Sequence, residues 1–130
     1  YAITYFYNVY GPREISYGKY ATLIALFKEK AKNSEPLTVV SPGTQKRNFT
    51  HVEDIIKGII LVGEKGEGDD YGIGSPESFS IIDIANMFEG VKIEMIPERA
   101  GNRMTAEVIT EKTIALGWSP TKTVINYIKN

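Results

Sequence analysis

Apolar and β-branched residues gather in short blocks along the chain, separated by polar turns. The block at residues 2–9 is aromatic and β-branched with few polar breaks, which is typical of a parallel-sheet strand covered on both faces. A Gly-Pro pair at residues 11–12 ends this block. Apolar positions then recur at helical spacing over residues 22–33, with Thr22 as the candidate N-cap, and a short strand follows at residues 37–41.

A second amphipathic helix is predicted to begin near residue 52. Glu53 and Asp54 stand in its first turn, where the helix dipole favours negative charge. The glycine-rich run GEKGEG at residues 63–68 is expected to end it as a solvated turn. The apolar positions that define its hydrophobic face are Val52, Ile55, Ile56, Ile59 and Ile60.

The following stretch predicts a strand end, a helix and another strand. Residues 71–75 are consistent with the end of a strand. Ser80 and Asp83 resemble a capping box, with Asp in place of the usual Glu, at the start of a helix. Residues 91–97 alternate between apolar and polar side chains, which indicates a strand.

The last part of the chain predicts two helices. Thr110 is the candidate cap of the first, which ends at Gly117, and the pair at residues 119–120, Ser-Pro, is expected to open the second. Trp118 lies between them and is interpreted as a core anchor, because large aromatic side chains mostly supply buried area. The inward positions of the terminal helix are predicted to be Val124, Ile125 and Ile128.

Strands and helices alternate throughout, so the predicted fold class is α/β, in a single unit spanning residues 1–130. The charge is balanced, with 15 Lys and Arg against 16 Asp and Glu, and this argues against a nucleic-acid partner. The chain has no cysteine, which favours a cytoplasmic location, and no apolar run approaches the roughly 20 residues of a membrane helix.

Common catalytic motifs are missing from the sequence. His51 is the single histidine, so a two-histidine metal site is excluded and a Ser-His relay would depend on this ring. The glycines of residues 63–68 follow a predicted helix, whereas a dinucleotide-binding turn lies between a strand and a helix. No tyrosine is followed four residues later by lysine. We therefore predict no catalytic residue in this chain.

Three polar residues have unusual neighbours. Arg47 lies between a Pro-Gly turn and the helix near residue 52, so it could grip phosphate or pair with Glu53 or Asp54. Arg99 is presented by a loop, as a binding group or as a solvated charge. Asn8, among aromatic residues, could donate to a ligand oxygen or cap the Gly-Pro turn. From the residues alone, both readings of each stay open.

Five ordered motifs resemble the extended short-chain dehydrogenases that act on nucleotide sugars, an epimerase/dehydratase family that includes UDP-glucose 4-epimerase. They are YFYNVYGPRE, GTQKRNFTHVEDI, YGIGSPESFSIIDIA, RAGN and ALGWSP. In that family the NAD-binding glycine turn and a Tyr-x-x-x-Lys pair lie upstream of the first motif. The resemblance implies a C-terminal substrate-binding lobe that begins in a late strand of the Rossmann sheet, with the N-terminal NAD-binding domain absent from this chain. An unprotected edge over residues 2–9 also favours truncation.

The resemblance also implies roles for individual residues. Asn8 would donate to the diphosphate of the sugar nucleotide, and Tyr7 would lie beside the nicotinamide of NAD. The backbone amide of Leu23 would face phosphate. Arg47 matches the family's diphosphate-binding arginine. The strand edge along which the base lies matches the residues from Thr38 to Val40.

Two positions depart from the family pattern. Arg99 matches the second arginine of an Arg-x-Gly-Asp motif, but Asn102 replaces the Asp that usually holds the ribose. The arginine that normally precedes the Tyr-Phe pair of the first motif is Tyr5 here. Asn102 can still bond a hydroxyl as a neutral amide, so the change bears on ribose contact and base preference.

The implied parent enzyme abstracts hydride from the sugar with bound NAD and so forms a transient keto sugar. We expect the nucleotide-diphosphate-sugar-binding portion of a UDP-glucose 4-epimerase-like enzyme, inactive alone. A 4,6-dehydratase fragment and a stand-alone noncatalytic sugar-nucleotide-binding module remain alternatives. The parent is expected to be a homodimer and the fragment mainly a monomer, with neither nucleic acid nor a membrane as partner.

Overall fold

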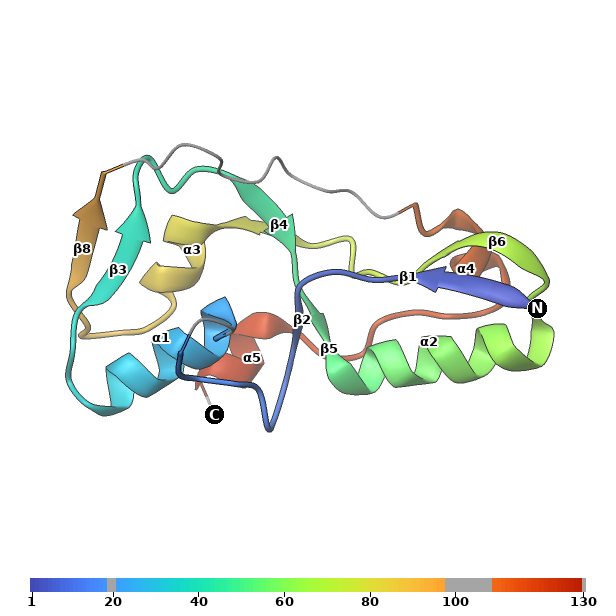
Figure 1. The fold of residues 1–130 in the computed structure, drawn as a ribbon, viewed down its shortest axis with the longest axis horizontal. Helices are drawn as coiled ribbons and strands as arrows, with labels where there is room; N and C mark the ends of the chain where they lie inside the picture. Colours follow the sequence, from blue (N-terminus) through green and yellow to red (C-terminus); the bar gives the residue numbers. More distant parts are fainter. Residues whose placement is uncertain (19–20, 98–108, 130) are drawn as a thin grey trace.

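The computed structural model describes residues 1–18, 21–97 and 109–129. Figure 1 shows an elongated arrangement, with β3, β8, α1 and α3 towards one end and β1, β6, α2 and α4 towards the other. The elements are β1 (Ala2–Tyr5), β2 (Val9–Tyr10), α1 (Leu23–Lys32), β3 (Leu37–Val40), β4 (Lys46–Asn48), β5 (Thr50–His51), α2 (Val52–Lys65), β6 (Gly68–Gly72), β7 (Ser78–Ser80), α3 (Ile81–Asn86), β8 (Ile93–Ile96), α4 (Glu111–Ala115) and α5 (Val124–Lys129).

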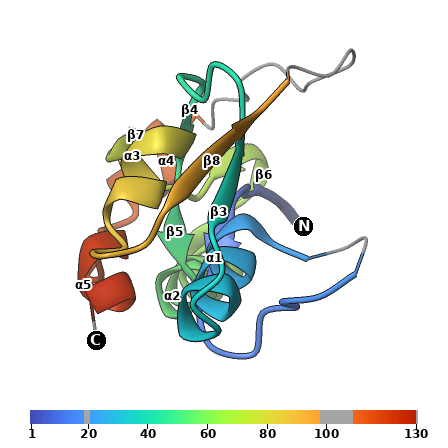
Figure 2. The same cartoon turned by 90° about the vertical axis from the view of Figure 1, so that its left-hand side faces the viewer.

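The strands pair in twos within the described residues. β1 with β6, β2 with β5 and β3 with β8 are parallel, and β4 with β7 is antiparallel. Figure 2 shows the β3–β8 pair with α1 and α3 beside it. Parallel strands that alternate with helices confirm the predicted α/β class. No helix in the described part of the chain has the length and apolar character to cross a bilayer.

The first predicted strand is wrong in two respects. Residues 2–9 form two short strands instead of one, because Asn8 between them takes a positive φ of 51°. The strand is also not covered on both faces. In β1 the side chains alternate between half-buried and exposed, with Ile3 and Tyr5 exposed. Strand β1 pairs with β6 along one edge and contacts α2, and its alternate side chains remain exposed to solvent.

A hydrophobic core lies where α1, β3, α3 and α5 meet. Phe27 of α1 and Phe88 beyond α3 pack edge to face, with ring centroids 6.0 Å apart. This arrangement suits the quadrupoles of two aromatic rings. The buried members of this core are Tyr10, Ile24, Phe27, Leu37, Val39, Phe49, Ile84, Ala85, Phe88 and Val124.

A smaller core lies under α2 and contains Trp118, Ile55 and Ile73. The indole Nε1 of Trp118 donates a hydrogen bond to the backbone carbonyl of Asp54 at 2.9 Å. The ring is buried, as predicted for a core anchor. Trp118 thereby attaches the C-terminal segment to α2.

The predicted start of α3 is confirmed, whereas that of the terminal helix is not. The capping box is confirmed: Ser80 Oγ accepts from the backbone N–H of Asp83, whose carboxylate accepts from the N–H of Ser80, both at 3.0 Å. The start of the terminal helix is wrong, because α5 begins at Val124 instead of at the Ser-Pro pair. Ile125 is exposed, contrary to the prediction that it points inward.

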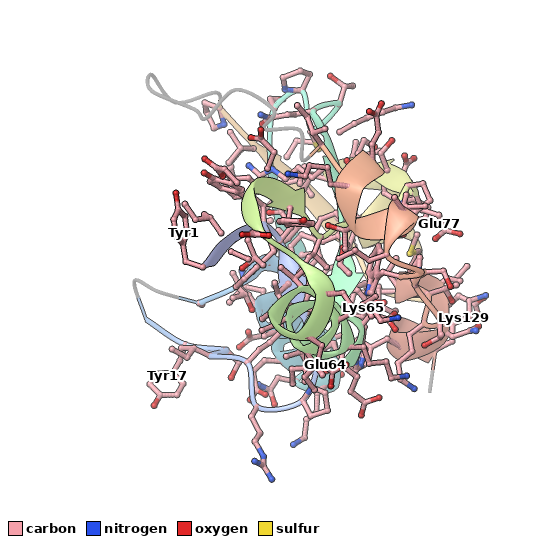
Figure 3. All side chains as sticks on the ribbon, turned by 90° about the vertical axis from the view of Figure 1, so that its right-hand side faces the viewer. Tyr1, Tyr17, Glu64, Lys65, Glu77 and Lys129 are labelled. Atoms are coloured by element: carbon pink, nitrogen blue, oxygen red, sulfur yellow. The ribbon has the colours of Figure 1, made fainter. Side chains whose placement is uncertain are left out.

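The predicted hydrophobic face of α2 is also only partly buried. Ile55, Gly58 and Val62 are buried against the small core, together with Asp54. Ile56, Ile59 and Ile60 are 40–55% exposed and form a second stripe along the outside of the helix. Figure 3 views this end of the molecule, with Glu64 and Lys65 at the near end of α2 and Tyr1 to one side.

Gly11 is the position in the turn after β2 where a side chain is least tolerable. Its φ is +151°, and a Cβ there would lie 2.6 Å from Val52 Cγ1. We expect Gly11→Ala to lower the free energy of unfolding by about 1 to 3 kcal/mol, measured by urea denaturation. Gly63→Ala is the control, because a Cβ at this position of α2 meets nothing within 4 Å. It should raise the stability by about 0.5 to 1 kcal/mol. Equal effects would contradict the steric argument.

Candidate functional site

The first turn of α1, the start of β2 and strand β4 surround a pocket of about 320 Å³. Asn8, Leu23 and Arg47, which come from separate parts of the sequence, all line it. The resemblance assigned each of them to the phosphates of a sugar nucleotide. The fold therefore brings these three predicted residues together.

Asn8 reaches this pocket through an unusual backbone conformation. Its φ of +51° lies in the left-handed region, which Asn adopts more readily than most residues because its short polar side chain can bond locally. Its backbone carbonyl accepts a hydrogen bond from the N–H of Thr50 at 3.3 Å, which ties the turn to β5. An amide side chain in this position can donate to a ligand oxygen.

The N-terminus of α1 borders the same pocket. Thr22 is the N-cap, as predicted, but its side chain makes no cap hydrogen bond. Its hydroxyl instead donates to Glu14 Oε1 at 2.9 Å. The N–H groups of the first turn, beginning with Leu23, have no acceptor within the helix. Such groups and the helix dipole together attract anions.

Arg47 lies in β4 opposite Phe79 of the antiparallel strand β7, and its side chain is half-buried. The neighbouring backbone is held firmly. Asn48 Nδ2 donates to the carbonyl of Ser75 at 2.6 Å, and Thr50 Oγ1 accepts from the N–H of Ser75 at 2.8 Å. A planar guanidinium presented from this strand can bind phosphate oxygens bidentately.

The two carboxylates weighed as alternative partners of Arg47 have partners of their own. Glu53 pairs with Lys122 Nζ at 3.3 Å on the exposed side of α2. Asp54 is fully buried and accepts hydrogen bonds from the backbone N–H groups of Thr121 and Lys122 and from the Thr121 hydroxyl. Asp54 is thus engaged by the segment that leads into α5.

Two predicted base-binding residues lie elsewhere. Thr38 and Val40 belong to β3, which pairs with β8, and neither lines the pocket. Thr38 Oγ1 accepts a hydrogen bond from Lys30 Nζ at 3.2 Å. Their assignment to the base stays a prediction.

Tyr7 directly precedes Asn8, and its side chain is 43% exposed. It does not line the pocket. Arg99 and Asn102 lie outside the residues that the structure describes. The predicted ribose contact therefore stays untested.

Sequence reasoning did not single out Glu14, which also lines the pocket. One of its oxygens accepts from Thr22, and the other, Oε2, is buried without a hydrogen-bond partner among the described residues. This carboxylate repels anions and accepts from hydroxyl or amine groups. No local pattern marks Glu14, because it follows Arg13 in a turn and meets α1 only in the folded chain.

His51 is a structural residue at the N-cap of α2. Its Nδ1 accepts a hydrogen bond from the backbone N–H of Glu53 at 3.1 Å. Burial is the main cause that lowers the pKa of His51, and the charge of Lys122 acts in the same direction. The charges of Glu53, Asp54 and Glu14 act in the opposite direction. Within the described ranges, no group of three His, Asp or Glu side chains could hold a metal ion.

This cap predicts a pH dependence of stability. Because the pKa of His51 is lower in the folded protein, the unfolded chain binds more protons as the pH falls below the ordinary value of 6.5. The free energy of unfolding should therefore fall between about pH 7 and pH 5. The control is His51→Asn, which replaces the Nδ1 acceptor with a side-chain oxygen that can cap the helix but does not titrate. Urea denaturation should show a shallower slope for this variant, and an equal slope would contradict the assignment.

Residues 1–74, more than half of the chain, match the sequence model of the NAD-dependent epimerase/dehydratase family. The chain belongs to this family. The match extends from β1 through β6 and so includes Asn8, Leu23 and Arg47. The resemblance drawn from the five motifs is confirmed at the level of the family.

Individual members of the epimerase/dehydratase family show how much of the fold is present. UDP-glucuronic acid decarboxylase 5 of Arabidopsis thaliana is 33% identical over 124 residues, which are 88% of this chain and 35% of the relative. UDP-glucose 4-epimerase from Thermotoga maritima, crystallised with UDP-glucose, superposes with a TM-score of 0.89 at 24% identity. The superposed region is 99% of this chain and 43% of the epimerase chain. UDP-glucuronic acid 4-epimerase from Bacillus cereus, in complex with UDP-glucuronic acid and NAD, has a TM-score of 0.83 at 25% identity, over 98% and 42% of the two chains.

The present chain thus spans about a third of the curated relative and less than half of the solved chains. The relatives include decarboxylases, epimerases and 4,6-dehydratases of nucleotide sugars. Members of the epimerase/dehydratase family therefore carry out different reactions on nucleotide sugars.

NAD is the cofactor that the family implies, and the described residues offer it few contacts. The glycine-rich run at residues 63–68 connects helix α2 to strand β6, which is the reverse of the order in a dinucleotide-binding turn. The exposed ring of Tyr7 is a flat apolar surface of the kind that a nicotinamide ring could contact. Among the described residues, Tyr7 is the one to which the family resemblance assigns a contact with NAD, and its assignment stays a prediction.

Proposed function

We propose that this chain is the nucleotide-sugar-binding portion of an NAD-dependent nucleotide-sugar epimerase. The observation that carries the proposal is the convergence of Asn8, Leu23 and Arg47 on one pocket of about 320 Å³. An amide donor, helix N–H groups and a guanidinium are the groups that a diphosphate requires. The nucleotide sugars named with members of this family supply such a diphosphate.

In the proposed complex each residue has a separate task. Arg47 neutralises charge on the diphosphate, and the N–H groups at Leu23 bind its oxygens. Asn8 donates a hydrogen bond to the diphosphate and so fixes its orientation. Glu14 accepts from hydroxyl groups of the ligand and repels the diphosphate from its own side of the pocket. When bound beside Tyr7, NAD would supply the hydride acceptor for oxidation of the sugar. Asn102 would contact the ribose, and Arg99 of the same motif would also bind the substrate.

We further propose that the chain works against a second α/β unit that carries most of the NAD site and the Tyr-x-x-x-Lys pair. The exposed stripe of Ile56, Ile59 and Ile60 on α2 and the exposed Ile3 and Tyr5 of β1 support this proposal. Apolar surface of this extent on a small protein commonly marks an interface.

A second candidate function is decarboxylation of a UDP-glucuronic acid. It is favoured by one observation, the 33% identity to a UDP-glucuronic acid decarboxylase over 88% of the chain. Both candidates need the same diphosphate site and the same initial oxidation. The epimerase and the decarboxylase would differ in their catalytic acid and base, and the described residues supply neither.

Calorimetric titration with UDP-glucose, UDP and uridine tests the proposed site. We expect UDP to bind at least tenfold more tightly than uridine, because uridine lacks the diphosphate that Arg47 and α1 contact. UDP-glucose should bind at least as tightly as UDP. Equal affinities for UDP and uridine would contradict a diphosphate site in this pocket.

A further inference from the structure

A second pocket, of about 370 Å³, lies between α1, the start of α2 and the segment that enters α5. Every side chain that lines this pocket can donate a hydrogen bond, two of them are lysines, and none is a carboxylate. The lining residues are Lys28, His51, Thr121, Lys122, Thr123, Asn126 and Tyr127. None of them belongs to the diphosphate site proposed above.

His51 is the best-fixed donor of this second pocket. Its side chain is 95% buried, as its exposed fraction of 5% shows. The Nδ1 atom accepts from the Glu53 backbone, so in the neutral ring the proton lies on Nε2. The ring packs edge-on against Tyr10 and Tyr127, at centroid distances of 5.2 and 5.7 Å. Within the described part of the chain, the Nε2–H has no hydrogen-bond partner and remains a donor for a ligand.

Two lysines add positive charge at the same place. Lys28 Nζ lies 3.8 Å from the centroid of the Tyr127 ring and donates to the Tyr127 carbonyl at 3.4 Å. Lys122 Nζ pairs with the exposed Glu53 at 3.3 Å. Each ammonium has three N–H donors, so these contacts leave donors for a ligand.

The chain before α5 supplies neutral donors. Thr123 Oγ1 accepts from the backbone N–H of Asn126 at 3.4 Å, which leaves its hydroxyl proton for a ligand. The Asn126 side-chain amide carries two further donors. Thr121 instead gives its hydroxyl proton to Asp54, at 2.8 Å. The position of this segment therefore depends on the buried carboxylate of Asp54.

We propose that this second pocket binds a phosphate group, with Lys28, Lys122 and His51 as its main ligands. A tetrahedral dianion fits better than a carboxylate because two cations and several neutral donors converge on a lining that contains no carboxylate. The nearby Glu53, which pairs with Lys122, is exposed to solvent. Tyr10 separates this pocket from the diphosphate site, since it lines that site while its ring contacts His51 and Tyr127. The two sites can therefore be tested independently.

The test is a titration with inorganic phosphate, followed by NMR, in an Arg47→Ala background that weakens the diphosphate site. Phosphate should shift the His51 and Tyr127 resonances and leave the Leu23 amide in place. A parallel titration with glucose 1-phosphate separates the two sources of the group: tighter binding than phosphate identifies a phosphomonoester ligand, and equal or weaker binding identifies free phosphate.

Lysine variants test whether phosphate binds in this second pocket. Lys28→Gln and Lys122→Gln should each weaken phosphate binding roughly five- to tenfold, the effect of losing one charge-assisted bond. Lys65→Gln, at the exposed end of α2, is the control and should leave the affinity unchanged. Equal affinities for all three variants, shifts confined to Leu23, or no shift up to about 50 mM phosphate would each overturn the proposal.

Discussion

Replacing Asp54 with alanine is expected to lower the free energy of unfolding by about 3 to 5 kcal/mol. The side chain is fully buried and accepts three hydrogen bonds from Thr121 and Lys122, at 2.8 to 3.0 Å. Its loss leaves two backbone N–H groups and a hydroxyl without their acceptor. Urea denaturation followed by the fluorescence of Trp118, which donates to the Asp54 carbonyl, reports the change directly.

The matched control is Glu53→Ala, one residue earlier in α2. Glu53 is exposed and forms one surface ion pair with Lys122, so its removal should cost less than about 1 kcal/mol. Similar losses for both variants would show that charge in the first turn of α2, instead of the buried contacts of Asp54, determines the stability of this region.

The second large effect is expected for ligand binding. Arg47→Ala should weaken the affinity for UDP by about 1.5 to 3 kcal/mol, or roughly ten- to a hundredfold, because it removes a charge-assisted bond to the diphosphate. Calorimetric titration of the wild type and the variant measures this difference. An unchanged affinity would remove Arg47 from the proposed site.

Lys46→Ala controls for the general loss of positive charge in strand β4. Lys46 precedes Arg47 in β4, its side chain is exposed, and it does not line the pocket. This variant should bind UDP within about twofold of the wild type, because exposed charges act weakly through solvent. A loss of UDP affinity as large as that of Arg47→Ala would mean that the overall positive charge of β4, and not a specific contact of Arg47, attracts the ligand.

Local patterns predicted those elements whose signals are contained within a few residues. Ser80 and Asp83 form their capping box wherever the rest of the chain lies, and the alternation at residues 91–97 suits β8 as one member of a parallel pair. Helix α1 and strand β3 were also predicted from their own residues. In each of these cases the periodicity and the caps agree with the tertiary environment.

Other features depended on residues far away in the sequence. The terminal helix begins at Val124, and not at Pro120, and the backbone N–H groups of Thr121 and Lys122 in the segment before it bind the carboxylate of Asp54. Nothing near residue 120 reports this contact. Periodicity likewise places Ile56 and Ile60 on one side of α2. It does not show whether another surface covers that side.

The candidate site was predictable only in part, for a related reason. From the residues alone Asn8 and Arg47 each had a structural alternative, and the family resemblance selected them together with Leu23. The pocket contains all three. Glu14 was missed because its role comes from the approach of α1 to the turn after β2, which no local spacing encodes.

The most direct test of the proposed diphosphate site is a two-dimensional NMR titration of the ¹⁵N-labelled chain with UDP. We predict that the largest shifts occur at the backbone amides of Leu23 and Ile24, the side-chain amide of Asn8 and the guanidinium of Arg47, which line one pocket. If these signals stay in place up to about 10 mM UDP, or if the largest shifts lie elsewhere, the proposed site is wrong.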